Sequence, residues 1–143
     1  MAEISAARVV TPIRGRRRVQ KKTPPPAAAK PDKAKRLVAK IRDHDSLAGE
    51  DMRFLWLNHS DLSGRDLRHA NLRGARLNCV NMAGSDLRGA VLEGAVLTGA
   101  CLQGTQLGDA DLRNTLVTGA NFQGAKGLRR ETRRILQERG AIV

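Results

Sequence analysis

The stretch that decides the fold runs from residue 60 to residue 124 and divides into five-residue units: SDLSG, RDLRH, ANLRG, ARLNC, VNMAG, SDLRG, AVLEG, AVLTG, ACLQG, TQLGD, ADLRN, TLVTG and ANFQG. Every fifth residue from Leu62 to Phe122 is apolar, which at 41% apolar content would arise by chance roughly once in 10⁵. A period of five fits neither the 3.6-residue repeat of a helix nor the two-residue alternation of a strand. It indicates a chain that turns a corner in every unit.

The apolar centre of each unit is expected to face a narrow enclosed axis, and the residue two positions before it is small in nearly every unit. Gly, Asn and Asp then suit the corners, where tight turns require positive φ. Arg65 departs from the pattern, and because an inward charge is costly we expect its side chain to turn outward. The predicted core consists of Leu72, Leu77, Met82, Leu87, Leu92, Leu97, Leu102, Leu107, Leu112, Val117 and Phe122.

Units such as Ala70-Asn71-Leu72-Arg73-Gly74 and Ala120-Asn121-Phe122-Gln123-Gly124 resemble the A(D/N)LxG units of the pentapeptide-repeat family. The resemblance covers residues 60–124 and implies an all-β solenoid, a right-handed quadrilateral β-helix with four units per coil and a little over three coils here. It also implies an alternative function, because some members of the family imitate DNA and bind type II topoisomerases. Those members dimerise through the C-terminal end, so the resemblance makes a homodimer through that end an alternative for this chain.

The segments that flank the repeat are expected to cover its open ends. We divide the chain into an extended basic arm (1–30), a short amphipathic helix with an N-terminal capping segment (31–59), the solenoid (60–126) and a C-terminal capping helix (127–143). Pro31 suits a first helical position, and Leu37, Val38 and Ile41 fall on one face. The residues expected to plug the N-terminal end are Phe54, Leu55, Trp56 and Leu57, and those expected to cover the C-terminal end are Leu128, Ile135 and Leu136.

Charge is concentrated at the ends of the chain. The net charge is +12, yet residues 60–124 contain equal numbers of basic and acidic residues. Residues 1–42 hold half of the 26 Lys and Arg residues, with only Glu3 and Asp32 as acids. Such a basic segment favours an anionic partner, contacted without reading sequence. The residues predicted to anchor the protein are Arg14, Arg16, Arg17, Arg18, Lys21 and Lys22.

Residues twenty positions apart should stack in columns on the outside of the solenoid. Two faces then carry alternating charges, such as Asp66 with Arg68 and Asp86 with Arg88, typical of solvated ladders. The face built on Leu77, Leu97 and Val117 carries no acid. Its outward columns are Arg76, Val96 and Leu116 on one side and Asn78, Thr98 and Thr118 on the other. We therefore predict a protein contact face at Arg76, Val96 and Leu116.

No pattern of residues predicts an enzyme, a cofactor or a metal. The recurring G-x-x-x-x-G spacing lacks the Lys and Ser or Thr of a phosphate-binding loop. The three His residues show no triad-like spacing. His59 and Cys79 share a column, but two ligands do not make a metal site.

The sequence thus predicts a non-catalytic structural or adaptor protein. Its solenoid would dock protein partners, and its arm would anchor it to nucleic acid, a nucleoprotein or a large assembly such as a virion. No run of about 18 apolar residues predicts a membrane span, and no apolar segment resembles a secretory signal. We expect a soluble intracellular or assembly-bound protein. The further alternatives are a mitochondrial or nuclear address in residues 1–30 and a secreted effector with an unknown partner.

Overall fold

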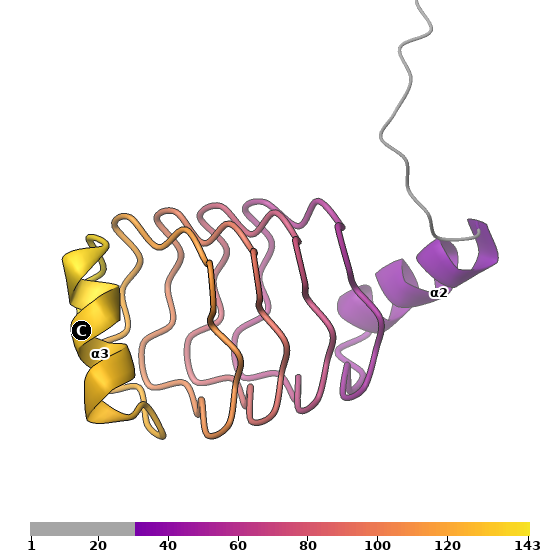
Figure 1. The fold of residues 1–143 in the computed structure, drawn as a ribbon. Helices are drawn as coiled ribbons and strands as arrows, with labels where there is room; N and C mark the ends of the chain where they lie inside the picture. Colours follow the sequence, from indigo (N-terminus) through magenta and orange to yellow (C-terminus); the bar gives the residue numbers. More distant parts are fainter. Residues whose placement is uncertain (1–30) are drawn as a thin grey trace, which may run out of the picture.

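The five-residue units fold into a parallel ladder that closes on itself (Figure 1). The computed structural model describes residues 31–143. Bridges pair Asp51 with Asn71, Asn71 with Val91 and Val91 with Asp111, so that bridged residues are twenty positions apart. The same spacing holds on the other sides as far as Lys126, so each turn has four five-residue sides.

Helix α2 (Pro31–Arg42) lies at the N-terminal end of the solenoid, and helix α3 (Arg130–Glu138) lies at the C-terminal end (Figure 1). Between them, each side contributes a single bridging residue rather than a longer strand. The ladder also reaches further toward the N-terminus than residue 60, because the Leu47 amide donates to the Asp66 carbonyl (2.9 Å) and Asp51 pairs with Asn71.

The solenoid interior is filled by the central residue of each unit and the small residue two positions before it. The central residues from Leu72 to Phe122 are all buried, most of them completely. Where the small residue is polar, its hydroxyl is satisfied locally: Ser85 donates to the Met82 carbonyl (2.7 Å), and Thr105 donates to the Leu102 carbonyl (2.8 Å). These hydroxyls therefore enter the core without leaving an unpaired polar group.

The corners require left-handed backbone, and at some of them the glycine also leaves room for a side chain of the preceding coil. Gly74 has φ 65°, and a Cβ added there would lie 2.6 Å from the ring of Phe54, one coil earlier. Phe54 itself has φ 61°, a conformation that is rare for a bulky residue. Phe54 therefore lies along the outside of a corner, against a glycine that leaves room for its ring.

The expectation that Arg65 turns outward is wrong. Its side chain is only 6% exposed, and its guanidinium donates to the carbonyl oxygens of Lys40 (3.4 Å), Asp45 (3.3 Å) and Ile41. Lys40 and Ile41 lie in the last turn of α2, where helix carbonyls lack intrahelical partners. The inward position is tolerated because Arg65 sits near the open end of the solenoid and caps the helix that covers it.

The N-terminal end is covered by α2, and the predicted capping residues Leu55 and Leu57 pack, partly buried, against the core. Leu37 of α2 is buried with the solenoid core and Ile41 is partly buried. Val38, expected on the same face, is 64% exposed. Phe54 (61% exposed) and Trp56 (60% exposed) lie on the outer surface, so the prediction that they plug the end is wrong.

The C-terminal end is covered by α3 and by the residues that follow it. Leu136 is buried, whereas Ile135 stays partly exposed. After Gly140, whose φ is 89°, the chain returns to the ladder and Ile142 pairs with Asn121. The Ile142 amide donates to the Ala120 carbonyl (2.8 Å), so the last edge of the solenoid is partly paired.

Candidate protein-interaction face

Two faces of the solenoid are neutralised by pairs of Asp and Arg two residues apart. Their short contacts, listed in chain order, are Arg53–Asp51 (2.8 Å), Arg68–Asp66 (2.8 Å), Arg88–Asp86 (2.6 Å) and Arg113–Asp111 (2.7 Å). The side-chain hydrogen bond from the Arg guanidinium is the largest cause that lowers the pKa of Asp66, Asp86 and Asp111. Their charges are therefore satisfied within the chain, on surfaces open to solvent.

A third face, built on Leu62, Met82, Leu102 and Phe122, is lined by amides. The Asn81 amide donates to Asp61 (3.2 Å), and the Gln103 amide donates to Gln123 (3.3 Å). These side chains link neighbouring coils, and at its C-terminal edge this face also carries Ile142, which pairs with Asn121 and is 49% exposed.

The fourth face differs in composition. Parallel bridges stack Trp56, Arg76, Val96 and Leu116 in one column, which we call the tryptophan face together with its neighbouring column of Asn58, Asn78, Thr98 and Thr118. Trp56 is 60% exposed and Leu116 is 58% exposed. Neither column contains a carboxylate.

Arg76 is held on this face by an aromatic ring. Its guanidinium carbon lies 4.9 Å from the centre of the Trp56 ring, within the range of a cation–π contact. In the neighbouring column, Asn78 donates to the Asn58 side chain through both its side-chain amide (2.8 Å) and its backbone amide (3.0 Å). The N-terminal half of the tryptophan face is thus ordered by its own contacts.

The C-terminal end of the tryptophan face is hollowed. A depression of about 350 Å³ lies beside Leu116 and is lined also by Asn114, Thr118 and Arg139. Leu116 faces solvent next to it, so an apolar side chain from another molecule could enter the depression and contact Leu116.

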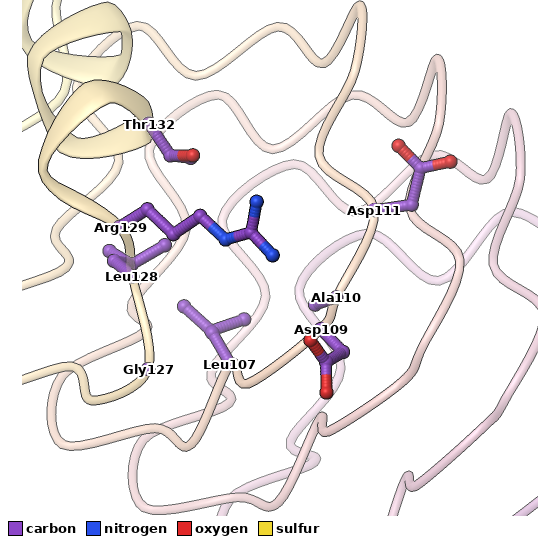
Figure 2. A pocket seen from close by; sticks show the side chains of 8 residues that line it. All are labelled: Leu107, Asp109, Ala110, Asp111, Gly127, Leu128, Arg129 and Thr132. Carbon is purple, nitrogen blue, oxygen red and sulfur yellow. The ribbon is translucent and has the colours of Figure 1, made fainter.

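A second depression, of about 320 Å³, lies where the chain enters α3 (Figure 2). Figure 2 shows the Arg129 side chain extending between Leu107 and Asp111, with Asp109 below it. Because a cation and two carboxylates line the same space, its charges favour no single class of ligand.

The structure brings the predicted contact residues Arg76, Val96 and Leu116 together in one column. Sequence reasoning missed Trp56, although a signal was present: Trp56 stands twenty residues before Arg76, and Met52 and Leu57 keep the apolar phase of the repeat. The predicted anchoring residues lie outside the described part of the chain; they are Arg14, Arg16, Arg17, Arg18, Lys21 and Lys22.

Over residues 31–143, no three His, Cys, Asp or Glu side chains are grouped so that they could bind a metal ion. No helix of this part of the chain has the length and apolar character needed to cross a membrane.

The geometry of the ladder agrees with a comparison of the sequence with protein families. The model of pentapeptide repeats matches residues 57–94, 75–114 and 92–126, with 8 copies. The chain is a pentapeptide-repeat protein. Pentapeptide repeats imply a right-handed quadrilateral β-helix, which is consistent with the four-sided turns described above.

Solved pentapeptide-repeat proteins resemble this one. A protein from the thylakoid lumen of Arabidopsis thaliana is 27% identical, with 67% of this chain and 78% of that chain covered and a TM-score of 0.35. A protein from the cyanobacterium Cyanothece 51142 is 36% identical, with 54% of this chain and 57% of that chain covered and a TM-score of 0.28. A search of curated proteins found no match.

Proposed function

We propose that this pentapeptide-repeat protein is a non-catalytic adaptor within a larger assembly. Its solenoid docks a protein partner through the tryptophan face, and its N-terminal basic residues attach it to an anionic surface such as nucleic acid or a nucleoprotein. The observation that carries the proposal is the contrast among faces: exposed Trp56 and Leu116 stand on the face without carboxylates.

Rigidity supports a docking role for the solenoid. Each coil is hydrogen-bonded to the next, for example from the Leu77 amide to the Val96 carbonyl (2.8 Å) and from the Leu97 amide to the Leu116 carbonyl (2.7 Å). A surface held in this way loses little conformational entropy when a partner binds. Exposed aromatic and aliphatic side chains on such a surface favour protein contact over solvation.

DNA imitation is the less favoured function, because the acids of the described solenoid do not form a continuous negative surface. Asp66, Asp86 and Asp111 are each bonded to an Arg two residues away. An imitation of the DNA backbone needs regularly spaced, uncompensated negative charge. We expect no inhibition of DNA gyrase supercoiling by the full-length protein.

One capture experiment separates the two halves of the proposal. The full-length protein, Leu116→Glu, Gln123→Glu and a chain lacking residues 1–30 are immobilised and exposed to extract of the source cells, with and without nuclease. Gln123→Glu is the matched control, because it adds the same charge on the amide face and keeps the oxygen that accepts from Gln103.

Leu116→Glu is expected to lose specific protein partners and to keep nucleic acid, whereas the shortened chain is expected to lose salt-sensitive nucleic acid and to keep the proteins. Recovery of the same proteins by Leu116→Glu and Gln123→Glu contradicts docking through the tryptophan face. Unchanged, salt-independent retention by the shortened chain contradicts the role of the basic residues. Circular dichroism of each variant shows whether it is folded.

A further inference from the structure

Arg76 differs from the other outward-facing arginines of the solenoid. Arg53, Arg68, Arg88 and Arg113 each bond to an Asp, and Arg73 lies 3.5 Å from Glu93. Within residues 31–143, no carboxylate lies within ion-pair distance of Arg76. The face therefore presents one guanidinium whose charge the described chain does not satisfy.

Trp56 orders this guanidinium without using its hydrogen-bonding capacity. A guanidinium over an indole ring is attracted by the ring face, and its N–H groups remain free to point outward at its edge. A free arginine loses rotamer freedom when it binds an anion, and the contact with Trp56 removes part of that cost in advance. The pair resembles a prepared site for a planar anion that accepts two parallel hydrogen bonds.

The surroundings of Arg76 restrict the partner further. Val96 and Leu116 continue the column, one and two coils beyond it, at steps of about 4.8 Å. Beside them stand Thr98 and Thr118, which are neutral. A ligand aligned with the solenoid axis thus meets Arg76 and then two aliphatic side chains, with Arg139 beside the last of them.

We propose that the tryptophan face binds an acidic–aliphatic segment of a protein, with an Asp or Glu carboxylate on Arg76 and aliphatic side chains on Val96 and Leu116. This inference rests on the proposed docking function and names the chemistry of the partner. The depression between Leu116 and Arg139 would receive the last aliphatic side chain.

A protein carboxylate fits this face better than a phosphate polymer does. Nucleic acid binding relies on several cations that follow the backbone, whereas the two columns of this face contain Arg76 alone. Exposed Leu116 and partly exposed Val96 would also gain nothing from a phosphate chain. Nucleic acid binding is therefore assigned to the N-terminal basic residues and not to this face.

Selection from a displayed library of random short peptides tests the inference. Peptides that bind the immobilised full-length protein are collected. Those that also bind the Leu116→Gln variant are then removed, which also removes any peptide held by residues 1–30. The remaining peptides are expected to be enriched in sequences that place Asp or Glu near Leu, Ile or Val. If no peptide remains, the docking face itself is wrong; if peptides remain without acidic residues, only the present inference is wrong.

The affinity of an enriched peptide then tests the role of Arg76. Arg76→Gln is expected to weaken binding about tenfold, the loss of one charge-assisted contact, and added salt should reduce the difference. Arg88→Gln removes the same charge from an arginine already bonded to Asp86 and is expected to leave affinity unchanged. Equal affinities of wild type and Arg76→Gln, or equal losses in both variants, would overturn the inference.

The contribution of Trp56 is separable from that of Arg76. Trp56→Leu keeps an apolar side chain but removes the ring, so Arg76→Gln is expected to cost less affinity in the Trp56→Leu background than in the wild type. Additive effects of the two substitutions would show that the ring does not order the guanidinium for binding.

Discussion

The two ends of the solenoid are covered by helices of similar length that are attached in different ways. At the N-terminal end, α2 buries Leu37 and is also held by polar contacts: Arg65 donates to its last carbonyls, Lys40 lies 2.6 Å from Glu50, and Lys33 lies 2.9 Å from Asp51. At the C-terminal end, α3 buries Leu136, and the residues after it rejoin the ladder through Ile142.

This difference shows that the basic residues of the chain do not share one role. The cations Lys33, Lys40 and Arg65 are engaged with the first coils of the solenoid and contribute to its structure. The attachment of α2 to the solenoid should therefore weaken when charges are removed or the pH is lowered. The attachment of α3 should weaken when buried apolar volume is removed. Three changes test this comparison, from the largest expected effect to the smallest.

Leu136→Ala should have the largest effect, because it leaves a cavity under α3. The substitution loses the free energy gained by removing the leucine side chain from water and also leaves a cavity, so the free energy of unfolding should fall by about 2–4 kcal/mol. Urea unfolding followed by circular dichroism measures this change. Ile135→Ala, on the same helix but partly exposed, is the control and should cost under about 1 kcal/mol. Equal losses would mean that α3 is not held by the side chain of Leu136.

Arg65→Met should release α2 while leaving α3 in place. The methionine fills part of the space but leaves the Ile41 carbonyl without its Arg65 donor and the Lys40 carbonyl with the Asp45 amide alone, at a cost of about 1–3 kcal/mol. Hydrogen exchange should accelerate at α2 amides and stay unchanged at α3 amides. Arg68→Met, three residues on at an exposed ion pair, should change neither. Uniform acceleration across the chain would show that Arg65 supports the whole solenoid and not one end.

The sequence was sufficient to predict the core, because the period of five determines which residues face the axis. Leu72 to Phe122 are buried at the expected phase, and the predicted column of Arg76, Val96 and Leu116 follows from the same arithmetic. These features depend only on residues close in sequence or a fixed number of positions apart, which is the information that a repeat pattern contains.

The errors occur where the repeat meets the rest of the chain. Arg65 faces inward because the carbonyls at the end of α2 arrive beside it, a contact between segments that no local pattern encodes. The prediction that Trp56 plugs the end rests on the need to cover an open coil, and the unit Leu55-Trp56-Leu57-Asn58-His59 lacks the small first residue and the corner glycine that most later units have. His59 nonetheless adopts φ 62°, so the unit turns its corner without glycine and places Trp56 on the outer column.

Acid should loosen the N-terminal end before the C-terminal end, and this is the smallest of the three effects. Hydrogen bonds from Arg53 and then Lys33 hold the pKa of Asp51 well below its ordinary value. A carboxylate whose pKa is lowered by folding stabilises the folded state at pH values above its unfolded pKa, about 4. That contribution decreases as the pH falls from about 4 toward the folded pKa, as Asp51 becomes protonated and its contact with Lys33 of α2 weakens. Amide exchange, corrected for its intrinsic pH dependence, should rise at α2 and not at α3, and Asp51→Asn should remove that difference between the two helices. If the two helices lose protection together in the wild type, the contrast between a polar and an apolar end is wrong.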